Sequence, residues 1–212
     1  MRRSAYLAIA ATMIATGLGV AIGSASPNAA EMSKLVAACA SCHGANGEGN
    51  EARSAPALAG LDAVYLERQL AHFAEGKRGN HAADKFGSQM AVIAKSLKDE
   101  DIAMIARHYA ELGSTASHVT INGDAAKGKA AYQSCAACHG ENGRGNPEMS
   151  APALIGQPDW YIAQSLLSYK AGGRGYHADD AAGQQMQQAA QIVSTDKEAR
   201  DIARYINSMS SN

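Results

Sequence analysis

The stretch "CAACHGENGRGN" from Cys135 to Asn146 repeats an earlier stretch, "CASCHGANGEGN", from Cys39 to Asn50. Each holds two cysteines separated by two residues, a histidine directly after the second cysteine, and several glycines behind it. A shift of 96 positions superimposes the two stretches, and about half of the residues from 39 to 94 are identical under that shift, without a gap. The chain is therefore a tandem repeat of one small unit.

The N-terminus precedes the repeat and has the order of a secretory signal. Arg2 and Arg3 come before an apolar run over 5–22, and small residues follow that run. We expect cleavage after Ala25 or Ala30. An uncleaved membrane anchor stays open as the alternative, because the run approaches the length that spans a bilayer. The organisation expected from these features is a signal peptide at 1–30, a first domain at 31–113, a linker at 114–123 and a second domain at 124–212.

Hydrophobic periodicity predicts an all-α fold. Apolar residues recur at three- and four-residue steps in the segments that close the two copies, 99–112 and 196–209. Thr195 and Glu198 form a capping box ahead of the last helix, and Asp99 is the expected cap of its counterpart. No segment alternates as strands do, so no sheet is expected. Further helices are expected at 32–38, 63–76, 125–134 and 160–171.

Composition limits both the partners and the core. The chain carries 19 Lys and Arg against 20 Asp and Glu, which gives no basic footprint for nucleic acid. Aromatic residues make up only 5% of the chain, and each copy is shorter than a hundred residues. A core of side chains alone is marginal at that size, so a bound group is expected to fill part of each interior.

The Cys-x-x-Cys-His pattern indicates what that group is. Two thiols at this spacing add to the vinyl groups of haem, and the adjacent imidazole ligates its iron. A redox dithiol would not need a histidine at the next position twice, and zinc sites usually gather their ligands within one small knuckle. The sequence therefore predicts two covalently bound haem c groups, held by Cys39, Cys42, His43, Cys135, Cys138 and His139.

An iron that already has a histidine needs a sixth ligand or an open position. Met90 and Met186 are the methionines that repeat under the shift, each 47 residues after its motif histidine. Repetition at a fixed distance favours ligation over ordinary core filling. His81 and His177 repeat as well, so ligation by two histidines stays open as the alternative.

With these residues in place, the chain resembles the cytochrome c4 family, whose members hold two class I cytochrome c domains in tandem. The segments "RGNHAADKFGSQM" and "RGYHADDAAGQQM" are similar to the distal-ligand segments of the c4 and c553 group. The resemblance implies that Met90 and Met186 are the distal ligands. It also implies that the carbonyls of Pro56 and Pro152 accept the ring N–H of the proximal histidines.

Three further expectations concern side chains around the haem. Arg78 and Arg174 precede the expected distal ligands, where a guanidinium can pair with a haem propionate; a solvated surface position is the alternative. Tyr65 and Tyr161 are either propionate donors or packed aromatic residues. Class I domains commonly carry glycine where the first and last helices cross, and Gly128 fits this pattern.

The first copy has Met32 at the position of Gly128, so a wider helix crossing is expected there. The function implied by the whole pattern is a periplasmic electron carrier, a monomer and not an enzyme. Its expected partners are redox proteins such as a membrane-bound oxidase or reductase, with no nucleic acid, and peripheral membrane contact stays open. The alternatives are an electron-accepting subunit of a dehydrogenase complex and a di-haem peroxidase.

Overall fold

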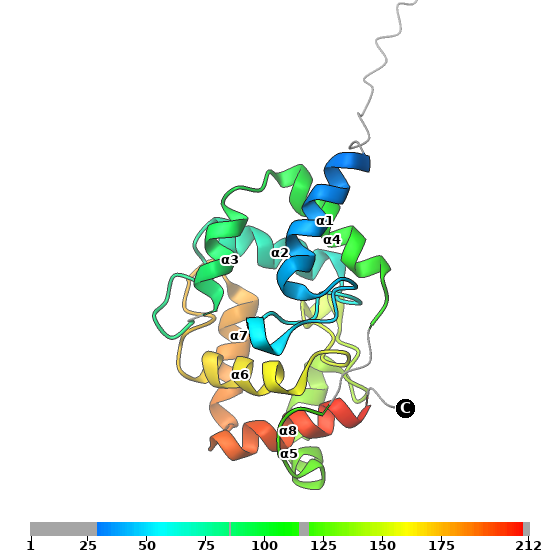
Figure 1. Cartoon of the computed structure of the whole chain (residues 1–212). Helices are drawn as coiled ribbons and strands as arrows, with labels where there is room; N and C mark the ends of the chain where they lie inside the picture. Colours follow the sequence, from blue (N-terminus) through cyan, green and yellow to red (C-terminus); the bar gives the residue numbers. More distant parts are fainter. Residues whose placement is uncertain (1–28, 85, 115–118, 210–212) are drawn as a thin grey trace, which may run out of the picture.

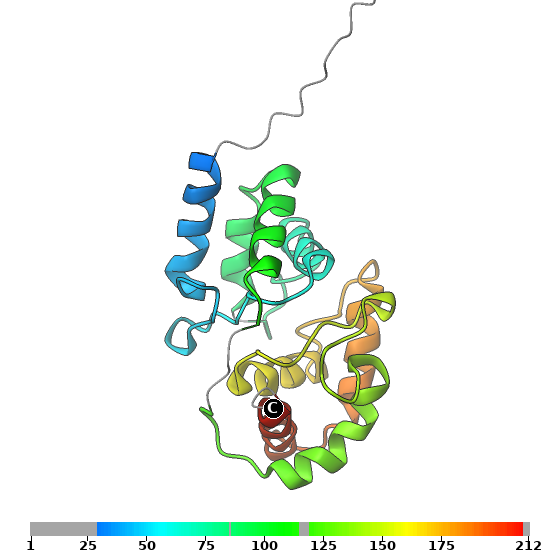
Figure 2. The ribbon, with the colours of Figure 1, turned by 90° about the vertical axis from the view of Figure 1, so that its right-hand side faces the viewer.

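The computed structural model describes residues 29–84, 86–114 and 119–209, and across them the chain forms two helical lobes, one above the other (Figures 1 and 2). The expected signal segment lies outside the described residues, except that Ala29 and Ala30 begin the first helix. The first lobe, called domain 1, contains α1 (Ala29–His43), α2 (Ala63–Ala74), α3 (Gly87–Ala94) and α4 (Asp99–Glu111). The second, called domain 2, contains α5 (Ala125–His139), α6 (Asp159–Lys170), α7 (Ala181–Ala189) and α8 (Asp196–Met209).

The all-α expectation is confirmed. Short 3-10 turns at Glu51–Arg53, Pro147–Met149 and Ala190–Ile192 complete the two domains. Within the described ranges β-pairing is limited to two isolated bridges, Asn50 with Ala55 and Asn146 with Ala151. These bridges lie at matching positions of the two copies and close the loop that follows each cysteine motif.

The helices that enter the cysteine motifs are longer than expected. The sequence predicts their ends before the first cysteine, but both continue through the motif to His43 and His139. Alanine, serine and cysteine are all tolerated in a helix, so nothing in the motif breaks the hydrogen-bond ladder. Each helix ends at a glycine with positive φ, Gly44 at +88° and Gly140 at +78°. One helix therefore positions both thiols and the imidazole of each motif.

The short helices α3 and α7, which carry Met90 and Met186, are not anticipated by periodicity. Their starting signal is an aspartate three residues before a glycine. Asp84 accepts a hydrogen bond from the Gly87 N–H at 3.1 Å, and Asp180 accepts one from the Gly183 N–H at 2.8 Å. A carboxylate at this position satisfies free N–H groups of the first turn.

The expected caps of the closing helices are partly correct. At α8 the Thr195 hydroxyl accepts the Glu198 N–H, and the Glu198 carboxylate accepts the N–H of Ser194 rather than that of Thr195. At α4 the expectation for Asp99 is wrong. Asp99 is the first residue inside the helix, and Asp101 makes the cap by accepting the Lys98 N–H at 3.0 Å.

The first and last helices of each domain cross differently in the two domains. In domain 2 a Cβ atom on Gly128 would lie 1.9 Å from the carbonyl oxygen of Asp201, so α5 and α8 approach backbone to backbone. In domain 1 the side chain of Met32 stands at the matching position and is half-buried, and His43 is the only buried residue among 30–43. The close crossing belongs to domain 2, as the glycine predicts.

Substitution of Gly128 by alanine tests this contact. The added methyl group would collide with the α8 backbone, and forced repacking of this kind costs about 1–3 kcal/mol. We expect Gly128→Ala to lower the urea midpoint of domain 2, although alanine is the better helix former. Met32→Ala at the matching position of domain 1 is the control and should change stability less. A Gly128→Ala protein as stable as wild type would contradict the close crossing.

Candidate functional site

Each cysteine motif presents a buried histidine with one ring nitrogen engaged. His43 is 6% exposed and its Nδ1 lies 2.8 Å from the Pro56 carbonyl oxygen; His139 is 8% exposed and its Nδ1 lies 2.9 Å from the Pro152 carbonyl oxygen. A carbonyl can only accept, so Nδ1 carries the proton and Nε2 is the free base. Burial lowers the pKa of both rings, and this effect is larger than that of the hydrogen bonds to the two proline carbonyls, which raise the pKa. Both imidazoles are therefore neutral and have an Nε2 lone pair available to a metal.

The four cysteines are free thiols. Cys39, Cys42 and Cys135 are half-buried and Cys138 is exposed, and none forms a disulfide. Burial raises the pKa of the thiols of Cys39 and Cys135, so both are protonated at neutral pH. In the part of the chain that the structure describes, no group of three or more Cys, His, Asp or Glu side chains could hold a metal ion.

The expected distal residues lie on α3 and α7, outside the helices that carry the motifs. Met186 is half-buried and packs against the core of domain 2, the same core against which Cys135 packs. Met90 is half-buried too, but it packs with Phe73, Ala91 and Ala94 in a cluster separate from the one that contains Cys39. The structure therefore brings motif and methionine to one core in domain 2 and to two neighbouring clusters in domain 1.

The alternative distal residues are more exposed. His81 is exposed, and its Nδ1 accepts the N–H of Ala83 two residues later. His177 makes the equivalent contact with the N–H of Asp179, and its side chain is 37% exposed. Both rings are held by local turns at the surface, where water competes with any ligand.

Two arginines meet tyrosines across the boundary between the domains. Arg78 stacks on Phe73 at 4.3 Å and donates to Tyr161 of domain 2 at 3.3 Å. Arg174, at the matching position, stacks on Tyr169 at 4.2 Å and is hydrogen-bonded to Tyr65 of domain 1. The residues that make these contacts in the two domains are related by the same 96-residue shift that relates the two sequence copies. The domains therefore face each other through a pseudo-twofold interface.

The pair Arg78 and Arg174 lacks anionic partners. Neither forms an ion pair with a carboxylate among the described residues, and the Nε atom of each is buried without a hydrogen-bond partner. Burial raises the pKa of the Tyr161 hydroxyl, but the two cations outweigh it and lower that pKa to about 8. Buried cations without anions are costly, so this interface is suited to receive carboxylate groups.

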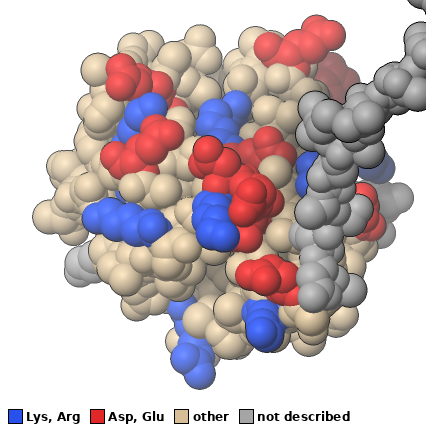
Figure 3. All heavy atoms as spheres, turned by 90° about the horizontal axis from the view of Figure 1, so that it is seen from above, with Lys and Arg blue, Asp and Glu red and all other residues tan. Residues whose placement is uncertain are grey.

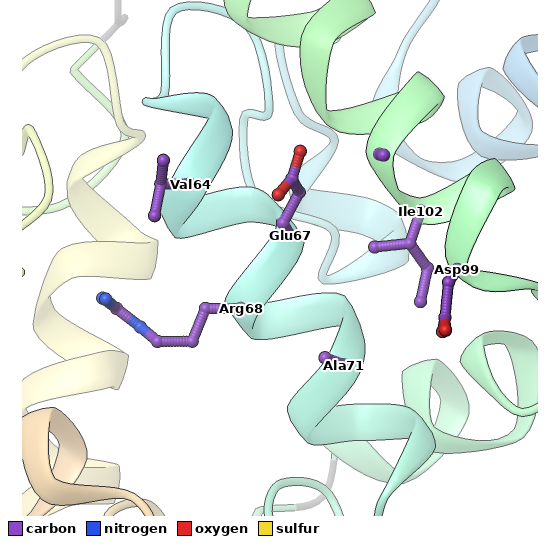
Figure 4. Close-up of a pocket in the computed structure, with 7 residues that line it drawn as sticks. Val64, Glu67, Arg68, Ala71, Asp99 and Ile102 are labelled. Atoms are coloured by element: carbon purple, nitrogen blue, oxygen red, sulfur yellow. The ribbon is translucent and has the colours of Figure 1, made fainter.

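More contacts fix the two domains together. Gln157 donates from Nε2 to the Ala57 carbonyl at 2.8 Å, and Arg68 donates to the Ser150 carbonyl at 2.9 Å. Arg68 points from α2 toward domain 2, away from the α4 side of a shallow groove of about 370 Å³ (Figure 4). None of the motif residues lines this groove, so it lies apart from the candidate sites.

The end of the molecule formed by domain 1 carries charges of both signs. On the end formed by domain 1, Lys and Arg are interspersed with Asp and Glu (Figure 3). This mixture agrees with the net charge of −1 and with the absence of a basic footprint in the sequence. A search of the described residues finds no helix that is long and apolar enough to cross a membrane.

Comparison with known proteins identifies the family. The model of the family described as Cytochrome c matches residues 29–110 and 125–210. The chain belongs to the cytochrome c family. It is 31% identical over 206 residues to cytochrome c4 of Pseudomonas aeruginosa, covering 93% of this chain and 94% of the relative. It is 35% identical over 152 residues to a "Thiosulfate dehydrogenase electron acceptor" of Thiomonas intermedia, covering 65% of each chain.

A solved structure agrees with the tandem arrangement. Cytochrome c4 of Acidithiobacillus ferrooxidans superimposes with a TM-score of 0.67 at 27% identity, over 81% of this chain and 99% of that one. The protein is a di-haem electron-transfer cytochrome of the c4 kind, with two haem c groups as its cofactors. The predicted family, fold and cofactors are confirmed.

The described residues fit these cofactors. Each motif offers two free thiols and one neutral Nε2 atom. The interface offers the buried guanidinium of Arg174 and the half-buried guanidinium of Arg78, neither paired with a carboxylate among the described residues, and a haem carries two propionate carboxylates. The donor set and the charge of the site therefore match one haem per domain.

Replacement of Arg174 by methionine tests the charge match. Loss of a buried cation near a propionate favours the ferric state, so we expect the midpoint potential of one haem to fall. Arg107→Met, on the exposed face of α4, is the control and should leave both potentials unchanged. Potentials are measured by optical redox titration of the di-haem protein. Equal potentials in wild type and Arg174→Met would contradict a propionate role for this residue.

Proposed function

We propose that the protein is a periplasmic electron carrier whose two irons are each held between histidine and methionine. Thioether bonds from the motif cysteines fix each haem, and the motif histidine supplies the proximal ligand through Nε2. Support comes from the engaged Nδ1 atoms and the unbonded thiols of both motifs. The proposed residues are Cys39, Cys42, His43 and Met90 for the first haem, and Cys135, Cys138, His139 and Met186 for the second.

Methionine is preferred over histidine as the distal ligand for two reasons. Met90 and Met186 are half-buried on helices capped in the same way, whereas His81 is exposed and His177 lies at the surface. A thioether opposite histidine is a standard ligand pair in electron-transfer cytochromes, because it raises the potential. A fixed sulfur also shields the metal from other ligands, so the protein transfers electrons without binding a substrate.

The repetition of one complete site in both domains is the observation that carries this proposal. Five features recur at the same spacing in both domains: the histidine at the helix end, the proline carbonyl that accepts its ring N–H, the aspartate before the methionine helix, the interface arginine and the methionine. Bound haem supplies a single electron by cycling its iron between the ferrous and ferric states. The chain holds and orients that group and excludes water from it, and we propose that it catalyses no reaction of its own.

The cellular setting follows from the N-terminal residues. A charged start, an apolar run and small residues support export and signal cleavage. The proposed partners are a respiratory donor and a membrane-bound oxidase or reductase that the protein meets in the periplasm as a monomer, with peripheral membrane contact or an uncleaved N-terminal anchor as the open alternatives.

Removal of each methionine tests the ligand assignment. Met90→Ala and Met186→Ala should each abolish the far-red methionine-to-iron charge-transfer absorption of one haem and lower its potential, because water or a weaker ligand replaces the sulfur. Met149→Ala, at an exposed position, is the control and should keep both bands. Retention of the full absorption in both Met90→Ala and Met186→Ala would transfer the assignment to His81 and His177.

A second candidate function is that of a dedicated electron acceptor for a dehydrogenase. The observation that favours it is the similarity to the relative named "Thiosulfate dehydrogenase electron acceptor". Size-exclusion chromatography of a native extract distinguishes the two roles. A mobile carrier elutes alone at the mass of one chain, whereas a dedicated acceptor elutes with a second polypeptide. Co-elution at high salt would favour the second role over the first.

A further inference from the structure

The two distal helices are capped alike but face different neighbours. Asp84 caps α3 and Asp180 caps α7, and a Cβ on the following Gly87 or Gly183 would lie about 2 Å from the carboxylate, at 2.1 and 2.0 Å respectively. Each carboxylate is therefore fixed over the first turn of its helix. Both are buried, at 8% exposure. The residue of the other domain that faces each carboxylate differs: His72 faces Asp180, whereas Ser168 stands at the matching position near Asp84.

Asp180 faces a histidine of domain 1. His72, in the last turn of α2, places its Nδ1 3.7 Å from the Asp180 Oδ1 atom, and both side chains are only 10% exposed. The distance is that of an ion pair rather than a hydrogen bond. The Nδ1 atom is buried without a hydrogen-bond partner. The imidazole is therefore positioned to bind a proton against a fixed carboxylate.

The backbone around this pair joins the domains. The segment of domain 2 that leads into α7 reaches the end of α2 (Figures 1 and 2). There the Tyr176 hydroxyl donates to the Gly76 carbonyl at 3.1 Å and accepts the Asn80 N–H at 3.3 Å. His81 packs on the Tyr176 ring at 5.4 Å. These contacts hold His72 and Asp180 in register.

The groups around the imidazole shift its pKa in both directions. Burial lowers the pKa of His72, Asp180 raises it, Lys77 and Arg68 lower it, and Glu75 raises it. Lys77 is paired with Glu75 at 2.6 Å. The carboxylate of Asp180 is therefore the anion that faces the His72 ring directly. The net effect is a pKa below the usual value of about 6.5, so His72 is neutral at pH 7 and binds a proton only at a pH below that value.

We propose that His72 binds a proton in step with reduction of the second haem, through the carboxylate of Asp180 that caps the Met186 helix. One electron arrives from a redox partner and lowers the charge at the iron by one unit. One proton arrives from solvent and binds the imidazole of His72. The total charge of domain 2 and the facing edge of domain 1 is then unchanged. The inference rests on Met186 as the distal ligand proposed above.

Linkage makes the coupling reciprocal. If reduction strengthens proton binding at His72, protonation of His72 must raise the potential of the second haem by the same free energy. A nearby imidazolium disfavours the additional positive charge of the ferric state. The potential of this haem therefore rises as the pH falls through the pKa of His72 and is constant above it.

The first haem lacks this device. Ser168 stands where the shift places the counterpart of His72, and its hydroxyl is buried without a partner. It lies beside the backbone of Ala83, next to Asp84, because the Cβ position of Gly173 is within 3.0 Å of both Ala83 and Ser168. The Oδ2 atom of Asp84 is likewise buried without a partner. A hydroxyl does not bind a proton in this pH range, so Ser168 cannot act toward Asp84 as His72 acts toward Asp180.

The test follows His72 and the two haems separately. The pKa of His72 is measured by NMR in the fully reduced and fully oxidised di-haem protein, and the two potentials are measured from pH 4.5 to 8. We expect a higher His72 pKa in the reduced protein and an acid-side rise in potential at one haem. His72→Gln should abolish that rise, and His108→Gln, on α4, should retain it. An equal His72 pKa in both oxidation states would overturn the proposal.

A gain-of-function variant gives an independent test. Ser168→His places an imidazole next to Asp84, so the first haem should acquire a pH-dependent potential. Asp180→Asn keeps the helix cap but removes the charge, and should weaken the coupling at the second haem. The far-red methionine band distinguishes a failure of the Met186 ligand assignment from a failure of the proton coupling at His72. If the band is intact in His72→Gln and the pH dependence of wild type persists, the coupling is wrong while the ligand assignment stands.

Discussion

A hydrogen bond from a buried histidine ring to a proline carbonyl thirteen residues later determines how each domain can work. It is made twice, from His43 to Pro56 and from His139 to Pro152, and it assigns the ring proton to Nδ1. The same helix that ends at the histidine carries both thiols, so attachment and ligation are positioned by one rigid element. Because Nε2 is then the free base, the motif can bind a metal from one side without further rearrangement.

The interface between the domains depends on the same duplication. Arg78 and Arg174 each stack on a ring of their own domain and reach a tyrosine of the other. Arg174 is buried and Arg78 is half-buried, and neither is paired with a carboxylate among the described residues, so negative groups at this interface would stabilise it. The haem propionates are suited to that role.

The sequence predicts the parts of this fold that repetition and chemistry reveal. The motif residues, the tandem division and the closing helices follow from spacing, and the crossing at Gly128 is implied by the resemblance to class I cytochrome c domains. Helices α3 and α7 escape prediction because they are short and because their starts are marked by a hydrogen bond from a glycine N–H to an aspartate three residues earlier, rather than by periodicity. The pairing of His72 with Asp180 also escapes it, since the partners are far apart in sequence and His72 does not repeat. Contacts between copies depend on how the copies pack, which the shift alone does not give.

Electron paramagnetic resonance of the resting, fully oxidised protein shows whether both axial positions of each iron are filled. Iron held between the Nε2 of a motif histidine and a methionine sulfur is six-coordinate and low-spin in both domains. We predict two low-spin ferric signals, one per domain, and we expect that added cyanide changes them only slowly. A high-spin signal in the resting protein would show an open axial position, and it would contradict the role of the chain as a carrier.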